Sequence, residues 1–193
     1  MKLYILRHED RTMDLTFFSP LTKNGLENSV ELIKHLEKEK INKIYSSPYI
    51  RTLQTINPYS KKYNINPKLD YSLTELYQED NIPKKSYQIT LPEYIAESFN
   101  FDKEYTSQLL PSNINFPEDD KNFKKRVKNF IKEVIKNNYK SNDNILLVTH
   151  QGVFDTILDI LRKKSSIDTE IKSDKGKFVK IFEDTKWNIK KIN

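Results

Sequence analysis

The stretch KLYILRH at residues 2–8 places an arginine and a histidine directly after a short apolar run. The stretch NILLVTHQG at residues 144–152 repeats this arrangement late in the chain, with His150 after its apolar run. An apolar run of this kind is typical of a strand buried on both faces of a parallel sheet. Because open α/β sheets build their sites at the C-terminal ends of strands, we predict that His8 and His150 share one site.

Outside this pair, segments with the pattern of strands alternate with segments of helical pattern. The clearest helix spans Glu118–Tyr139, where apolar residues recur at helical spacing and acidic residues precede lysines, as the helix dipole favours. We also expect strands at 2–6, 41–45 and 144–149, helices at 22–40, 48–56 and 153–162, and a terminal hairpin at 178–182 and 187–192. This alternation predicts an α/β fold with three αβα layers, a mostly parallel sheet, an antiparallel edge strand and an irregular or helical insertion.

Capping residues predict where two of these helices begin. Thr22 is expected to cap the first helix through its hydroxyl group. Ser46 or Ser47 is expected to cap the second, with Pro48 at its first position. Pro58 lacks an N–H donor, so it is expected to end or kink this second helix.

The length of 193 residues suits a single domain, which we expect to span residues 1–193. Residues 77–117 are expected to form an insertion or cap segment, because they contain several prolines and tyrosines and show no clear period. Specificity in such folds lies in loops, so residues 9–20 and 77–117 are expected to select the substrate.

Composition argues against several classes of protein. Charged residues make up 31% of the chain, the net charge is +6, and no apolar run approaches the ~18 residues of a membrane span. The absence of cysteine excludes disulfides, thiolate metal sites and cysteine nucleophiles. The abundant lysines are interpreted as solvated, and the N-terminal apolar run is too short for a signal peptide. We expect a cytoplasmic protein that binds neither nucleic acid nor membrane.

The residues around the two histidines suit phosphoryl transfer. A histidine can attack phosphorus directly and form a phosphohistidine, which divides one difficult step into two. Arginine binds phosphate with two parallel hydrogen bonds, a histidine held as an imidazolium adds a donor, and a carboxylic acid protonates the leaving oxygen. The chain offers each of these groups in Arg7, His8, Arg51, His150 and Glu75.

Five stretches of the chain resemble, in order, the motifs of the histidine phosphatase superfamily, the phosphoglycerate mutase-like proteins. The longest, SSPYIRTLQT at residues 46–55, resembles the Ser-Ser-Pro-x-x-Arg-x-x-Gln-Thr motif of that family. The other four are LRH at 6–8, LTKNG at 21–25, LTE at 73–75 and VTHQGV at 148–153.

This resemblance implies a role for each matching residue. His8 would be the nucleophile and Glu75 the proton donor, while His150 would belong to the catalytic set. Arg7, Arg51 and His150 would bind the phosphate of the substrate. No metal and no cofactor are implied. The substrate would be a phosphorylated small molecule or a phosphoprotein, and the oligomeric state stays open.

Glu9 departs from the family pattern, which usually has glycine after the first histidine. A carboxylate pointing into the pocket would repel phosphate by about 1–4 kcal/mol at ~4 Å, whereas one turned away would cost little. Two alternatives are that Glu9 or Asp10 replaces Glu75 as the acid, and that one of them selects a cationic group on the substrate.

Three functions are consistent with these residues. The leading one is a metal-independent phosphomonoesterase that forms a phosphohistidine at His8. A mutase-like phosphotransferase is second, although the chain lacks the Trp-Asn pair and the longer loop of the mutases after the first motif. A catalytically weak or silent member that binds a phosphorylated partner is third, and Glu9 is the residue that suggests it. Arg126, which lies among lysines, is expected on a solvated helix face.

Overall fold

The computed structural model describes residues 1–14, 16–77, 93–114, 116–162, 171–183 and 186–192. Within them, six strands form one sheet in the order β3-β2-β4-β1-β5-β6. Its parallel part comprises β3 (Lys68–Leu69), β2 (Lys43–Ser46), β4 (Asn144–Thr149) and β1 (Lys2–Arg7). At the other edge, β5 (Phe178–Glu183) pairs antiparallel with β1, and β6 (Lys186–Lys191) pairs antiparallel with β5. The mostly parallel sheet with an antiparallel edge is therefore confirmed.

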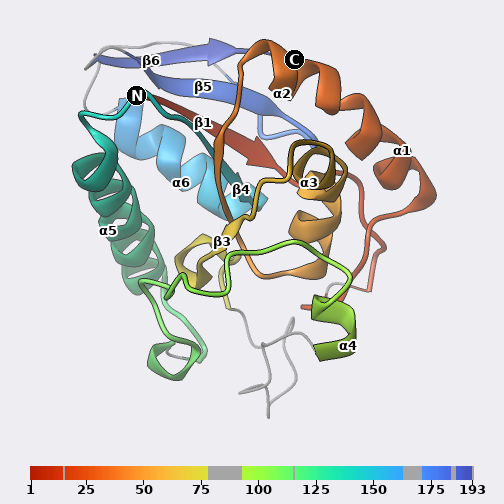
Figure 1. Cartoon of the computed structure of the whole chain (residues 1–193). Helices are drawn as coiled ribbons and strands as arrows, with labels where there is room; N and C mark the ends of the chain where they lie inside the picture. The colour runs from red at the N-terminus through yellow and green to blue at the C-terminus, as the bar shows by residue number, and fades with distance from the viewer. Residues whose placement is uncertain (15, 78–92, 115, 163–170, 184–185, 193) are drawn as a thin grey trace.

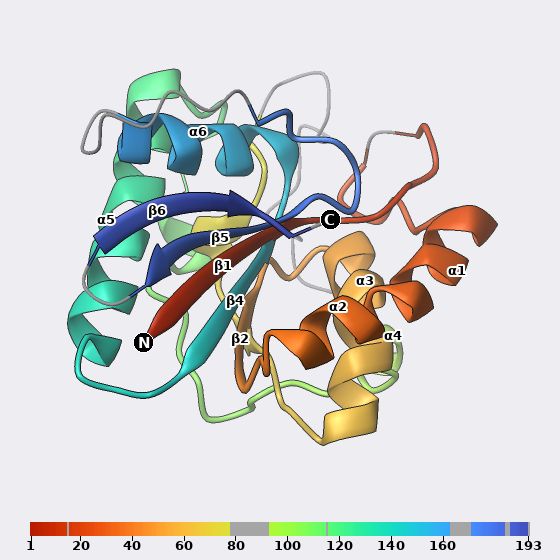
Figure 2. The ribbon, with the colours of Figure 1, turned by 90° about the horizontal axis from the view of Figure 1, so that it is seen from above.

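Helices cover both faces of this sheet, as Figures 1 and 2 show. One face carries α5 (Asp120–Asn138) and α6 (Gln151–Arg162). The other carries α1 (Lys23–Glu31), α2 (Ile33–Lys38) and α3 (Ile50–Tyr63). Each helical layer packs its apolar side chains against the sheet, which gives two buried clusters and confirms the three αβα layers.

The central strands β1 and β4 contribute to both clusters at once. Leu3 and Ile5 face the α5 and α6 side, whereas Tyr4 and Leu6 face the α1 to α3 side. All four side chains are fully buried. A strand covered on both faces has no polar side, and this explains why the run in the sequence is continuous rather than alternating.

The predicted helix starts are confirmed in one case and displaced in the other. The Thr22 hydroxyl accepts a hydrogen bond from the Gly25 N–H at 3.1 Å and caps α1 as expected. The second helix begins at Ile50 rather than Pro48, after an extended Tyr49. Pro58 lies inside that helix, which continues to Tyr63. The buried apolar face of α3 offsets the hydrogen bond that the proline removes.

The expected insertion at 77–117 falls partly outside the described residues. Its described part contains the short helices α4 (Glu93–Ala96) and η3 (Pro111–Asn113), and its role as an insertion or cap stays a prediction. Before it, the short helix η1 (Tyr71–Leu73) follows β3 and leads to Glu75. None of the described helices combines the length and the apolar character needed to cross a bilayer.

Candidate active site

The two histidines lie side by side at the C-terminal ends of adjacent parallel strands. β1 and β4 pair in register, with Arg7 opposite Thr149. The backbone N–H of His8 donates to the carbonyl of Thr149 at 2.9 Å. The His8 and His150 ring centroids are 5.2 Å apart. The prediction that both histidines belong to one place in the fold is confirmed by this register.

The His8 imidazole is held in one tautomer. Its Nδ1 lies 2.7 Å from the carbonyl oxygen of Glu9, which can only accept, so Nδ1 carries the proton. Nε2 therefore keeps its lone pair. Burial, with the nearby Arg51 as a second cause, lowers the pKa of His8 to about 3. The ring is neutral at ordinary pH, as a nucleophilic nitrogen requires.

The structure holds His150 as a neutral ring, and the imidazolium that binds phosphate stays an expectation. Its Nδ1 accepts a hydrogen bond from Arg51 Nε at 3.3 Å, and its Nε2 lies 2.8 Å from the Ser47 hydroxyl. Burial first, and then the charge of Arg51, lowers the pKa of His150 well below its ordinary value. Both ring nitrogens therefore have hydrogen-bond partners. The ring does not itself line the cavity described next.

A small cavity of about 110 Å³ opens beside His8. Three arginines, Arg7, Arg11 and Arg51, contribute to its wall. Two of them, Arg7 and Arg51, come from the predicted set, so the structure brings these together with His8 as expected. The remaining residues of the wall are Thr16, Phe17, Tyr49, Glu75, Leu76 and Gln151.

Each arginine is held in place by contacts with other residues of the protein. The Arg51 guanidinium lies over the Tyr49 ring at 4.4 Å and donates to the Thr16 carbonyl at 2.9 Å. Burial lowers the pKa of Arg51 to about 10, so it remains charged at neutral pH. Arg7 donates to the Ser173 carbonyl, while its buried Nε has no partner among the described residues.

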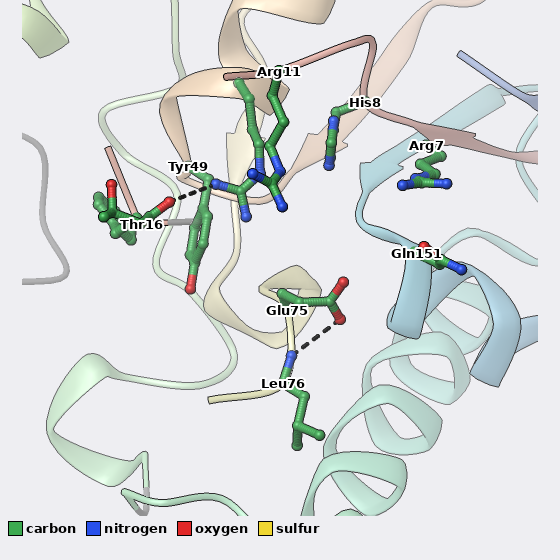
Figure 3. Close-up of a pocket in the computed structure, with 10 residues that line it drawn as sticks. Arg7, His8, Arg11, Thr16, Tyr49, Glu75, Leu76 and Gln151 are labelled. Atoms are coloured by element: carbon green, nitrogen blue, oxygen red, sulfur yellow. Dashed lines mark hydrogen bonds between the residues drawn. The ribbon is translucent and has the colours of Figure 1, made fainter. Parts of the chain in front are cut away.

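Arg11 is a cavity residue that the sequence did not single out. Its strand bridge to Leu21 and its hydrogen bond to the Thr12 carbonyl, 2.7 Å long, hold it in the loop after β1. Figure 3 shows its guanidinium directed into the same space as the His8 ring. A residue in an irregular loop carries no periodic signal, so only the folded loop places it here.

Glu75 faces the arginines across the cavity. Its Oε2 accepts from the backbone N–H of Gly152 and its Oε1 from that of Leu76, both at 3.1 Å. Figure 3 shows the carboxylate directed toward the space between His8 and Gln151. A Cβ at position 152 would lie 2.4 Å from Glu75 Oε1, which explains the glycine there.

Glu9 points away from the cavity. Its side chain is only 5% exposed, and its Oε2 accepts from Asn28 Nδ2 at 3.4 Å. It packs on Gly176, where the positive φ of 69° favours glycine and an added Cβ would lie 2.1 Å from Glu9 Oε1. Burial raises the pKa of Glu9. The carboxylate therefore sits too far out of the pocket to act as its acid or to repel phosphate at contact distance.

Asp10 is likewise a structural group rather than a cavity residue. It forms an ion pair with Lys175, and its Oδ2 accepts from the Thr22 hydroxyl at 2.8 Å. Its carbonyl accepts from the Thr22 N–H at 2.9 Å, so Asp10 secures the start of α1. Among the described residues, Glu75 is the carboxylate that lines the cavity beside His8.

Arg126 corrects another expectation. It is 8% exposed and buried between α5 and the segment before Glu75, not on a solvated face. The neighbouring Lys125 is exposed, as expected for the lysines of this helix. Charge periodicity alone does not distinguish the two, because Arg126 finds its partners in residues distant along the chain.

A second cavity of about 470 Å³ adjoins the first. The two share Arg11, Glu75, Leu76 and Gln151 as wall residues. The outer cavity is further lined by Asp120, Phe123, Gly152, Asp155 and Thr156. The inner space suits a phosphoryl group and the outer one has room for an organic group attached to it. Among the described residues, no group of three or more potential ligands is arranged to hold a metal ion.

Comparison with known proteins supports this description of the fold. The chain is similar to an ecdysone phosphate phosphatase from Bombix mori, with a TM-score of 0.74, 14% identity, and coverage of 97% of this chain and 91% of that chain. It is similar to a phosphoglycerate mutase from Bacillus anthracis, with a TM-score of 0.68, 18% identity, and coverage of 99% and 92%. It is also similar to a putative alpha-ribazole-5'-P phosphatase from Escherichia coli, with a TM-score of 0.68, 19% identity, and coverage of 100% of this chain and 96% of that chain.

No curated protein matches the sequence. At these low identities the solved structures establish a shared fold and nothing finer. A family model, in contrast, matches residues 6–193, which include both histidines, the three cavity arginines and Glu75. The chain belongs to the histidine phosphatase superfamily, branch 1.

Proposed function

We propose that this protein is a metal-independent phosphomonoesterase that acts through a phosphohistidine at His8. One observation carries the proposal: the unprotonated Nε2 of His8 stands beside a small cavity with three arginines in its wall and Glu75 across from it. The arginines provide the positive charge that a phosphate dianion needs. The phosphatases among the structurally similar proteins support hydrolysis as the reaction class.

In the first step, His8 Nε2 attacks phosphorus as the bond to the ester oxygen breaks. Glu75, in its protonated form, gives its proton to that oxygen, and the alcohol leaves. The phosphoryl group is then bound to His8, and its oxygens are held by Arg7, Arg11 and Arg51. In the second step, water attacks phosphorus while the Glu75 carboxylate takes its proton. His8 leaves as the neutral ring, and inorganic phosphate is released.

His150 serves this reaction first by orienting Arg51. Its Nδ1 accepts from Arg51 Nε at 3.3 Å, and Ser47 fixes the other side of the ring at 2.8 Å. A phosphate dianion bound next to Arg51 would favour the protonated form of His150, because a nearby negative charge stabilises the cation. Direct contact between His150 and the phosphate stays part of the proposal.

The substrate is proposed to be a phosphorylated small molecule or a phosphoprotein. The inner cavity of about 110 Å³ accepts the phosphoryl group, and the adjoining space of about 470 Å³ accepts the group that carries it. Two structurally similar proteins are named for phosphate esters of unlike alcohols, ecdysone and alpha-ribazole. The outer cavity therefore sets specificity in this proposal, whereas the inner one sets the reaction.

The two other functions are weighed by the same geometry. A mutase-like phosphotransferase would use the same His8 but pass the phosphoryl group back to an organic hydroxyl. Detection of phosphate in water, rather than of an isomerised phosphate ester, separates the two. The hypothesis of a silent phosphate-binding protein loses its support, because Glu9, the residue that suggested it, is turned toward Asn28 and Gly176.

The deciding experiment follows hydrolysis of p-nitrophenyl phosphate in EDTA by the wild-type protein and two histidine variants. His8→Ala is expected to abolish turnover, while His35→Ala, a substitution in α2 away from the cavity, leaves it unchanged. Quenching in alkaline detergent in the presence of radiolabelled substrate should trap an alkali-stable, acid-labile phosphoenzyme in the wild type and in His35→Ala, and none in His8→Ala. Activity that survives His8→Ala, or that disappears in EDTA, would overturn the proposal.

A further inference from the structure

Arg126 uses every donor of its guanidinium on groups inside the protein. It is 8% exposed, and an arginine has five N–H donors. Nε and Nη2 donate to Glu118 Oε1 and Oε2, both at 2.7 Å. Nη1 donates to the carbonyls of Ser72 and Thr74, both at 2.9 Å, and Nη2 also donates to the carbonyl of Glu75 at 3.0 Å. Five acceptors therefore match five donors.

Glu118 is an equally buried partner. Its side chain is 5% exposed and that of Arg126 is 7% exposed, so the ion pair is shielded from water. The pairing is bidentate, which is the strongest geometry open to an arginine and a carboxylate. The backbone N–H of Glu118 donates to the Tyr77 carbonyl at 2.9 Å, so Glu118 also contacts the chain after Glu75. Removing either charge leaves the other buried without its counterion.

These contacts converge on the main chain that carries Glu75. Arg126 binds the carbonyls of Ser72, Thr74 and Glu75. The Thr149 hydroxyl donates to the Leu73 carbonyl at 2.7 Å. The Glu75 carboxylate is held separately by the Gly152 N–H. The main chain of Glu75 is thus tied to α5, and its carboxylate to α6. Neither Arg126 nor Glu118 lines the cavity beside His8.

We infer that Arg126, with Glu118, is a positioning residue for the general acid Glu75, an inference that rests on the proposed function. A general acid must lie within hydrogen-bond reach of the oxygen that it protonates. A displacement of about 1 Å in a reacting group can reduce the rate about 100-fold. The buried ion pair opposes such a displacement. The main chain of Glu75 is hydrogen-bonded to Arg126, and Glu118 holds Arg126 in place.

The leaving group of the substrate distinguishes this role from a general contribution to folding. p-Nitrophenolate is a stable anion and departs without a proton, whereas the alkoxide of an alkyl phosphate needs one. A displaced Glu75 therefore slows the first step far more for alkyl phosphates than for p-nitrophenyl phosphate. Its loss as the base of the second step affects both substrates alike, so the contrast is read from kcat/KM, which reports the first step. Loss of folded protein, in contrast, would lower both rates by the same factor.

The experiment compares kcat/KM for p-nitrophenyl phosphate and glycerol phosphate in four variants. Glu75→Gln supplies the reference for a missing acid. Arg126→Lys retains the charge but not the five-donor fork, and Glu118→Gln retains the size but not the charge. Lys125→Met is the matched control, because it changes an exposed cation of the same helix. Thermal unfolding of each variant gives its folded fraction.

For Arg126→Lys and Glu118→Gln we expect kcat/KM on glycerol phosphate to fall about 10- to 100-fold, which is up to the lower end of what general acid catalysis contributes. The fall in kcat/KM on p-nitrophenyl phosphate should be under threefold, and Lys125→Met should match the wild type. If Arg126→Lys does not fold, Glu118→Gln decides the outcome by itself, because its side chain has the same shape.

Two results would overturn the inference. Equal losses on both substrates in the folded variants would show a structural role only. A leaving-group effect in Glu75→Gln that is absent in Arg126→Lys and Glu118→Gln would remove the positioning role and leave the proposed function intact. If Glu75→Gln itself shows no leaving-group effect, the assignment of the acid fails, and the positioning role fails with it.

Discussion

The carboxylate of Glu75 and the backbone of Gly152 are bonded at 3.1 Å, across 77 residues of chain. Gly152 lies in the first turn of α6, directly after His150 and Gln151. The helix that follows the second histidine therefore also supplies the donor that orients the acid. A helix N-terminus favours a negative charge, so this contact holds the carboxylate in place when it is ionised.

Gly152→Ala is expected to impair activity without lowering stability. The added Cβ would meet Glu75 Oε1 at 2.4 Å, so the carboxylate must move. Alanine is about 1 kcal/mol more favourable than glycine inside a helix, which offsets the cost of that movement. We expect kcat for an alkyl phosphate to fall on the order of 100-fold. Steady-state kinetics and thermal unfolding check this together, and an unchanged kcat would contradict it.

Arg11→Gln is expected to weaken phosphate binding. A hydrogen bond to a charged group contributes about 1.5–3 kcal/mol, which corresponds to about a 10- to 100-fold rise in the inhibition constant of inorganic phosphate. Lys23→Gln, which alters a lysine whose side chain is 92% exposed, is the control. An inhibition constant for Arg11→Gln that equals the control's would show that Arg11 only lines the cavity.

The His8 ring should stay neutral throughout the physiological range of pH. Its pKa of about 3 results from burial first and from Arg51 second. Arg51→Gln removes one positive charge and should raise the pKa of His8 toward its ordinary value. NMR titration can follow this, because the chain has only 3 histidines to assign. A His8 resonance that titrates near 6.5 in the wild type would contradict the prediction.

Glu9→Gln is expected to retain full activity and to gain stability at high pH. Burial raises the pKa of Glu9, so the folded state holds its proton to a higher pH than the unfolded state does. The wild type therefore loses stability as the pH rises from the unfolded pKa toward the folded one. The Tm difference between Glu9→Gln and wild type should be larger at pH 8 than at pH 4. An equal Tm difference at pH 4 and pH 8 would show that burial does not raise the pKa of Glu9.

Much of the fold follows from local pattern. Continuous apolar runs predict the buried strands β1 and β4, because a strand covered on both faces cannot alternate. The Thr22 cap is correct because capping depends on groups within one turn of chain. The start of α3 is displaced to Ile50, and there a distant contact matters: the Ser47 hydroxyl lies 2.8 Å from His150 Nε2.

The sequence by itself determined the layered α/β fold, the family, and the pair formed by His8 and His150. Apolar periodicity and short motifs record these features in adjacent residues, so no tertiary contact is needed to recognise them. Only the tertiary structure decided that Glu9 turns away from the cavity, that Arg11 enters it, that His150 is neutral, and that Arg126 is buried. Each of these outcomes depends on burial and on partners far apart in the chain. Solvent exclusion and close contact set the charge and direction of a side chain, and both exist only once the chain has folded.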